Sequence, residues 1–133
     1  MALPLFLDRG LGSRLVPEGL RTAGWAVTTM DERYGTDASQ SVKDEDWIQD
    51  AASRGELLVC KDRNVAKRRL EAQAIYYSSA RVLVIASASI SGPEMLARLL
   101  RNADAISALE PRRGPWVFGV YEHRLGPIRL NFP

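Results

Sequence analysis

The fold is decided by the stretch ELLVCKD at residues 56–62. It joins a short apolar run to a lysine and an aspartate, and we predict that residues 56–60 form a buried strand that ends at these charged side chains. The run RVLVIA at residues 81–86 is almost continuously apolar, which is typical of a strand covered on both faces in a parallel sheet. Two more strands are expected at residues 3–7 and 25–29.

Segments with the apolar spacing of helices lie between and after these strands. We predict helices at residues 13–23, 41–54 and 63–77. Another opens with the capping pattern at Ser91 and has apolar positions at helical spacing as far as Ile106. Residues 31–40 show no clear period and are expected to form a loop.

The alternation of strands and helices predicts a three-layer α/β/α domain with a mostly parallel central sheet. Near the end of the chain, residues 116–122 and 128–132 flank a turn at residues 125–127, which predicts a C-terminal hairpin. We therefore expect one domain over residues 1–133, with residues 112–133 as a hairpin extension.

Composition narrows the class of protein. The chain has 133 residues, of which 46% are hydrophobic and 26% charged. Its net charge is only +2, so the net charge does not indicate a polyanionic partner. The single cysteine, Cys60, excludes an internal disulfide and a cysteine zinc site. The start of the chain lacks a basic leader and no apolar run approaches the roughly 18 residues of a membrane span. We expect a cytoplasmic protein that does not enter the membrane.

Carboxylates follow two of the predicted strands at the points where the strands end. Asp8 comes directly after the first strand, and Asp62 follows the third. In an open α/β sheet, ligands bind beyond the carboxyl ends of the strands, so both side chains are expected to face one crevice.

A third carboxylate is expected from the start of the helix at residues 41–54. Asp44 precedes Trp47 and Ile48 by three and four residues, which places it on the inward face of that helix. Asp46 lies about 200° further round and faces solvent. We therefore favour Asp44 as the site residue, with Glu45 as the second choice.

Three acids in one crevice would repel each other, and a bound divalent cation relieves that repulsion. Hard oxygen ligands suit Mg²⁺ or Mn²⁺, which could activate water to attack a phosphodiester. The structural alternative is that each aspartate caps a helix or forms a turn, as aspartates after strands often do.

A basic segment, KDRNVAKRR at residues 61–69, begins at the predicted metal site. Lysine and arginine supply the phosphate contacts that give sequence-independent affinity for nucleic acid. The candidate RNA-binding residues are Lys61, Arg63, Lys67 and Arg68. The alternative is a solvated helix face, and the two interpretations remain open.

The motifs FLD at residues 6–8, DEDWI at 44–48 and LVCKDR at 58–63 resemble those of the PIN-like nucleases. They are especially similar to the short VapC-type toxins of bacterial toxin–antitoxin pairs, and the resemblance covers about residues 3–110. It implies a ribonuclease that uses Mg²⁺ or Mn²⁺, with RNA as substrate and a cognate antitoxin protein as partner. A homodimer is a further expected assembly.

By resemblance, Asp8, Asp44 and Asp62 are the metal-binding and catalytic acids. Many relatives have a further acid or asparagine after the fourth strand, where this chain has Ser87 as a candidate auxiliary residue. Asn64 is another candidate auxiliary ligand. Cys60 stands where many relatives have threonine or serine, and we expect it to be a buried, inert strand residue.

Two other functions fit parts of the sequence. A receiver-like signalling domain would use Asp62 as phosphoacceptor and Ser87 as its hydroxyl residue. A degenerate PIN-like module would bind RNA or a protein partner without cutting.

His123 is the only histidine and is expected at the surface, which argues against histidine-based catalysis.

Overall fold

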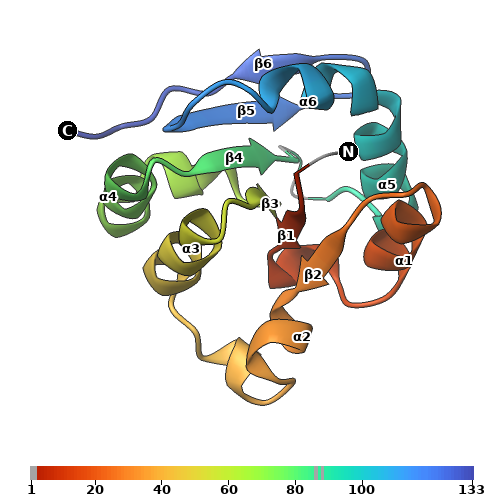
Figure 1. Ribbon diagram of the computed structural model, residues 1–133, viewed down its shortest axis with the longest axis horizontal. Helices are drawn as coiled ribbons and strands as arrows, with labels where there is room; N and C mark the ends of the chain where they lie inside the picture. Colours follow the sequence, from red (N-terminus) through yellow and green to blue (C-terminus); the bar gives the residue numbers. More distant parts are fainter. Residues whose placement is uncertain (1–2, 86, 88) are drawn as a thin grey trace.

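The computed structural model describes residues 3–85, 87 and 89–133. In this part of the chain six strands form one sheet in the order β2-β1-β3-β4-β5-β6 (Figure 1). The first five are parallel, and β6 pairs with β5 in the antiparallel direction. The strands are β1 (Leu5–Leu7), β2 (Val27–Thr29), β3 (Leu57–Cys60), β4 (Arg81–Val84), β5 (Trp116–Val120) and β6 (Leu125–Pro127).

Helices cover both faces of the sheet. In Figure 1, α3 and α4 lie on one side, while α1 and α5 lie on the other. The predicted three-layer α/β/α architecture is confirmed. The helices are α1 (Leu15–Thr22), α2 (Met30–Tyr34), α3 (Asp44–Ser53), α4 (Arg69–Ser78), α5 (Gly92–Arg101) and α6 (Ala103–Leu109), with 3₁₀ turns η1 (Arg9–Leu11), η2 (Ala38–Gln40) and η3 (Arg63–Ala66).

The alternation of side chains along each strand builds a separate core on each face of the sheet. Leu5 and Leu7 of β1 pack with α1 and α5, whereas Phe6 between them packs with α3. Every residue of β1 and β3 is buried, as expected for central strands of a parallel sheet.

The predicted loop at residues 31–40 is wrong, because this segment contains α2 and η2. A capping box starts α2: the Glu32 backbone N–H donates to Thr29 Oγ1 (3.1 Å), and the Thr29 N–H donates to Glu32 Oε1 (2.9 Å). These reciprocal bonds satisfy two N–H groups that a helix start otherwise leaves free.

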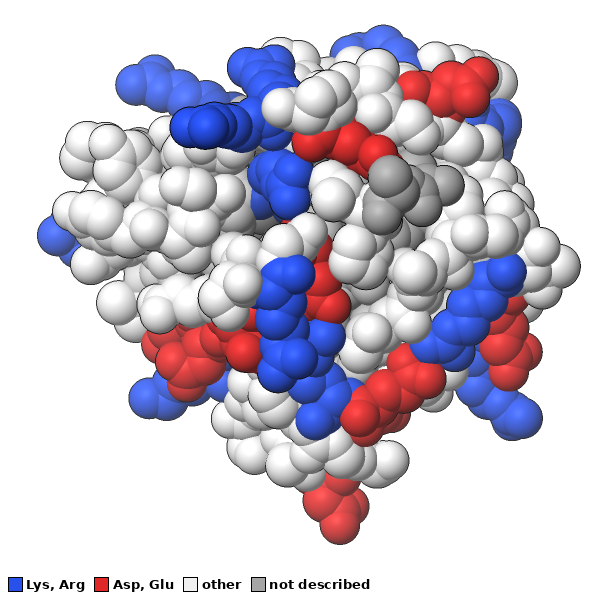
Figure 2. Space-filling model, in the orientation of Figure 1, with Lys and Arg blue, Asp and Glu red and all other residues white. Residues whose placement is uncertain are grey.

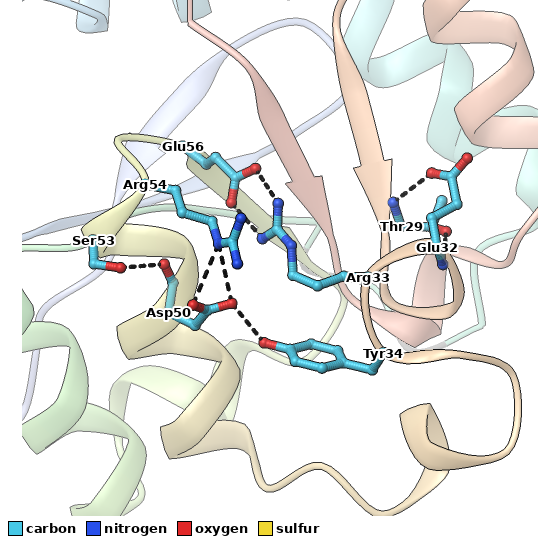
Figure 3. Close-up of polar contacts among 8 residues, drawn as sticks. All are labelled: Thr29, Glu32, Arg33, Tyr34, Asp50, Ser53, Arg54 and Glu56. Atoms are coloured by element: carbon cyan, nitrogen blue, oxygen red, sulfur yellow. Dashed lines mark hydrogen bonds and ion pairs between the residues drawn. The ribbon is translucent and has the colours of Figure 1, made fainter.

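A polar clamp holds α2 against the start of β3 and against α3 (Figure 3). Arg33 donates two hydrogen bonds of 2.6 Å to the carboxylate of Glu56, and their side chains are only 10% and 6% exposed. The Tyr34 hydroxyl donates to Asp50 of α3 over 2.9 Å. The clamp fixes the segment that leads into α3.

The predicted helix at residues 63–77 is broken. The backbone N–H groups of Lys67 and Arg68 both donate to the carbonyl of Asn64, which closes η3. Arg68 then has an extended backbone, and α4 begins at Arg69. The helix predicted from Ser91 is also divided, because Asn102 separates α5 from α6.

The C-terminal hairpin exists, but its second strand lies earlier than predicted. Residues 125–127, expected to be the turn, form β6, and the Tyr121 N–H donates to the Arg124 carbonyl across the actual turn. Residues 128–132 are not a strand; there the Asn131 N–H donates to the Ala66 carbonyl. Strand β4 ends at Val84, and Ala86 of the predicted strand lies outside the described residues.

Candidate active site

The carboxyl ends of β1 and β3 lie side by side at one edge of the sheet. Leu7 pairs with Val59, and the Asp8 N–H donates to the Val59 carbonyl over 2.9 Å. Asp8 directly follows β1. Asp62 comes two residues after Cys60, the last residue of the neighbouring strand β3. The strand ends bring these two acids to the same edge, as the sequence predicted.

Asp8 is a partly buried carboxylate at the centre of the candidate site. Its Oδ1 accepts a 2.7 Å hydrogen bond from the Arg9 backbone N–H. The pKa of Asp8 is raised to about 6, chiefly by burial; the Arg9 backbone hydrogen bond and guanidinium act to lower this pKa, and the charges of Asp44 and Asp62 act to raise it. Because these charges act on one group, the three acids share one electrostatic environment.

Asp44 is the first residue of α3, which begins there rather than at residue 41. Its Oδ1 accepts a 2.9 Å hydrogen bond from the indole Nε1–H of Trp47, so Asp44 does lie on the Trp47 side of the helix. Asp46 is exposed on the other side. The helical spacing therefore separated the two aspartates correctly.

Asp62 caps η3 and pairs with an arginine. Its Oδ1 accepts a hydrogen bond from the Asn64 backbone N–H (2.9 Å), and its Oδ2 lies 2.6 Å from Arg68 Nη1. The hydrogen bond to Asp62 raises the pKa of the Arg68 guanidinium. The capping role is the structural alternative raised for this aspartate, whereas its ion pair with Arg68 was not predicted.

The site as it stands does not enclose an ion-binding cage. Among the described residues, no three acidic, histidine or cysteine side chains are grouped closely enough to hold a metal ion. Instead, Arg9 lies against Asp44 and Arg68 lies against Asp62. The carboxylate oxygens of the three aspartates are ligands that suit a hard divalent cation. In this structure the two arginines supply the positive charge beside these carboxylates.

Cys60 lies buried beneath the acids. Burial raises the pKa of its thiol well above the usual value, and the charges of Asp8 and Asp62 add to this effect. An uncharged, enclosed thiol is a poor nucleophile, in agreement with the expectation that Cys60 is inert.

The candidate auxiliary residues lie around this edge. Glu45 is partly buried next to Asp44 in α3, and Asn64 contacts Asp62 through its backbone N–H. Ser87 follows β4, where its backbone N–H donates to the Ile85 carbonyl. Their roles as ligands remain predictions.

The candidate RNA-binding residues are distributed unevenly. Arg63 and Lys67 are exposed on η3 and just after it. Arg68 is engaged with Asp62, and Lys61 Nζ donates to the Ile90 carbonyl over 3.4 Å. Figure 2 shows basic and acidic side chains intermixed on the face in view, so no field of one sign covers it.

Sequence reasoning missed Arg9. Its Nη1 lies 3.8 Å from Asp44 Oδ1, and its Nη2 donates to the carbonyls of Ser39 and Val42. The side chain thus connects the end of β1 with the segment that enters α3. The only signal was its position next to Asp8.

His123 was placed correctly at the surface, with a side chain that is 75% exposed.

Comparison with known proteins gives two matches. A model of the family described as "PIN like domain" matches residues 4–87, a range that contains Asp8, Asp44 and Asp62. The chain is 33% identical over 121 residues to a Mycobacterium tuberculosis protein named "Putative ribonuclease VapC45", and the match covers 91% of this chain and 88% of that protein. No solved structure matches the chain.

These matches carry more weight than strand order. The order β2-β1-β3-β4-β5 is also that of receiver-like doubly wound folds, so the sheet alone does not separate the two classes. The family match favours the PIN-like alternative over the receiver-like one.

In the described part of the chain, no helix combines the length and apolar character that a membrane crossing requires.

Proposed function

Because the chain belongs to the PIN-like domain family, we propose that it is an endoribonuclease that cleaves RNA phosphodiester bonds with Mg²⁺ or Mn²⁺. The observation that supports the proposal is that Asp8 and Asp62 follow the neighbouring strand ends of β1 and β3, while the charges of Asp44 and Asp62 both act on Asp8. Their mutual repulsion and the burial of Asp8 are what a divalent cation would relieve. The name of the curated relative supports RNA as the substrate.

The three aspartates would hold the metal through their carboxylate oxygens. When bound, a divalent ion polarises a phosphodiester and lowers the pKa of an attacking water. Arg9 and Arg68 place positive charge beside Asp44 and Asp62. Binding would require Asp62 to exchange its ion pair with Arg68 for the metal.

Released from Asp62, the Arg68 guanidinium is free to contact an RNA phosphate. Arg63 and Lys67 are exposed beside it and would position the RNA backbone. We assign Lys61 to the same surface, although its ammonium is also anchored at Ile90. These contacts carry no base preference, because phosphates are the same at every position.

By its similarity to VapC-type proteins, the chain would be the toxin of a toxin–antitoxin pair in the cytoplasm, and its partner would be a cognate antitoxin protein. A homodimer stays a prediction. A co-expressed antitoxin should relieve the growth arrest that the chain causes when expressed alone.

A second candidate function is a PIN-like module that binds RNA or a partner without cutting. The absence of a ready metal cluster among the described residues favours it. It predicts no metal binding at millimolar Mg²⁺ or Mn²⁺.

The test of the first function is metal dependence. Purified protein is incubated with labelled RNA in EDTA, and then with Mg²⁺ or Mn²⁺ added back. Cleavage that appears only with the metal supports the proposal. No cleavage of any RNA, together with no metal binding by calorimetry, supports the non-cutting module instead.

A further inference from the structure

A pocket of about 210 Å³ shares Arg9, the residue after Asp8, with the candidate active site. It opens where β1 and β2 end, and Thr29 at the end of β2 pairs with Leu7, the residue before Asp8. Adjacent strands are about 4.8 Å apart, so the pocket adjoins the acid site. Its lining residues are Arg9, Gly12, Ser13, Thr29, Met30, Asp31 and Gln40.

Arg9 is common to the pocket and to the acid site. Arg9 lines the pocket, and its Nη1 lies 3.8 Å from Asp44 Oδ1. An RNA strand whose phosphate reaches Asp8 would therefore also pass close to the pocket. The Arg9 charge at this boundary would attract that phosphate.

The pocket itself has a carboxylate on its wall. Asp31 Oδ1 accepts a 2.5 Å hydrogen bond from the Ser39 hydroxyl. Within the described residues, Ser39 is the one side chain that donates to Asp31, and Asp31 lines the pocket, so we assign its other oxygen to a ligand. Thr29 Oγ1, by contrast, is already engaged in capping α2.

A carboxylate accepts hydrogen bonds and offers none. It repels a phosphate and favours the edge of a base that carries an amino group. Adenine, cytosine and guanine have such a group, whereas the single N–H on the pairing edge of uracil lies between two carbonyl oxygens that the carboxylate repels. The buried side chain of Met30 adds an apolar surface to the same wall.

We infer that this pocket receives one nucleobase of the RNA next to the scissile phosphate, and that Asp31 selects bases with an amino group over uracil. The inference rests on the proposed ribonuclease function. It makes base preference a property of the segment that holds α2 and η2, separate from the acids that would carry the chemistry.

The variant that tests it is Asp31→Asn. The asparagine oxygen can still accept from Ser39, and its NH₂ group then faces the ligand and favours carbonyl oxygens. Asp37→Asn is the matched control, because Asp37 is an exposed acid of the same segment that does not line the pocket.

The first experiment sequences the cut ends from a random RNA pool treated with parent, Asp31→Asn and Asp37→Asn proteins. We expect uridine to be depleted about tenfold at one position beside the cut, which is the effect of one charge-assisted hydrogen bond. Asp31→Asn should reverse this depletion, and Asp37→Asn should keep it. An Asp31→Asn protein that cuts with the parent's preference overturns the inference.

The second experiment needs neither cleavage nor a variant. Binding of AMP, CMP, GMP and UMP to the parent protein in EDTA is measured by ligand-detected NMR. Weaker binding of UMP than of the other three supports the pocket even if no RNA is cut, in which case only the proposed function fails. Equal affinity for all four nucleotides overturns the inference.

Discussion

The guanidinium of Arg9 lies against the carboxylate of Asp44, with 3.8 Å between Nη1 and Oδ1. The same side chain donates through Nη2 to the carbonyls of Ser39 and Val42, and both hydrogen bonds are 3.0 Å long. Arg9 therefore contacts two of the acids, because its backbone N–H donates to Asp8 while its guanidinium lies against Asp44. The site is therefore held together by an arginine fork as well as by strand ends.

Replacing Arg9 by lysine should loosen this connection. Lysine keeps the positive charge but lacks the planar fork that can serve Asp44 and two carbonyls together. We expect RNA cleavage to fall by about tenfold to a hundredfold, as for a catalytic group displaced by about 1 Å. Hydrogen exchange of the amides at residues 36–42 should speed up. Unchanged exchange and unchanged cleavage would show that Arg9 does not position Asp44.

The pKa of Asp8, raised from 3.8 to about 6 chiefly by burial, predicts a pH-dependent cost in stability. Above pH 6 the folded protein must ionise a carboxyl group that the unfolded chain ionises more easily, so Asp8 lowers the free energy of unfolding there. Below pH 4 the group is protonated in both states and the effect disappears.

Accordingly, Asp8→Asn should raise the free energy of unfolding by about 1–3 kcal/mol at pH 7.5 in EDTA. The gain should vanish as the pH falls below 4. Urea denaturation across this pH range measures it, with the exposed Asp46→Asn as control. A gain that stays constant with pH would argue against an elevated Asp8 pKa.

The buried pair of Arg33 and Glu56 predicts a large loss of stability when one partner is removed. Glu56→Gln leaves the Arg33 guanidinium enclosed without its counter-charge, which should lower the free energy of unfolding by about 3 kcal/mol. The exposed pair of Arg54 and Asp50 gives the contrast, because Arg54→Gln should change stability little. Equal effects of the two variants in urea denaturation would contradict the clamp in Figure 3.

Cys60 should resist thiol reagents in the folded protein. Its side chain is enclosed and its pKa is raised, so little thiolate is available. Because it is the only cysteine, any label found by mass spectrometry is at this position. We expect labelling by iodoacetamide only after denaturation, and rapid labelling of native protein would place Cys60 elsewhere.

The strand ends and the helical phase were predictable from sequence because they depend on short-range patterns. The apolar runs before Asp8 and Asp62 predicted buried parallel strands, and the ends of such strands meet at one edge. The spacing from Asp44 to Trp47 predicted the face on which Asp44 lies, and the Trp47–Asp44 hydrogen bond agrees.

Other features depended on competing local signals. Thr29 and Glu32 form a T-x-x-E capping box, which was a sequence signal for α2 that the lack of apolar periodicity obscured. Gly126 and Pro127 suggested a turn, yet they lie in an edge strand, where a missing N–H is tolerated. The contacts of Arg9 and the pocket around Asp31 join segments distant in sequence, so no local pattern could reveal them.

The central claim is that Asp8, Asp44 and Asp62 carry a metal-dependent cleavage of RNA. The most direct test measures cleavage rates in Mg²⁺ for Asp8→Asn, Asp44→Asn and Asp62→Asn beside the exposed control Asp46→Asn. The proposal predicts that each of the first three falls by about a hundredfold or more while Asp46→Asn stays near the parent. A protein that carries both Asp8→Asn and Asp62→Asn and still cleaves as fast as the parent would contradict it.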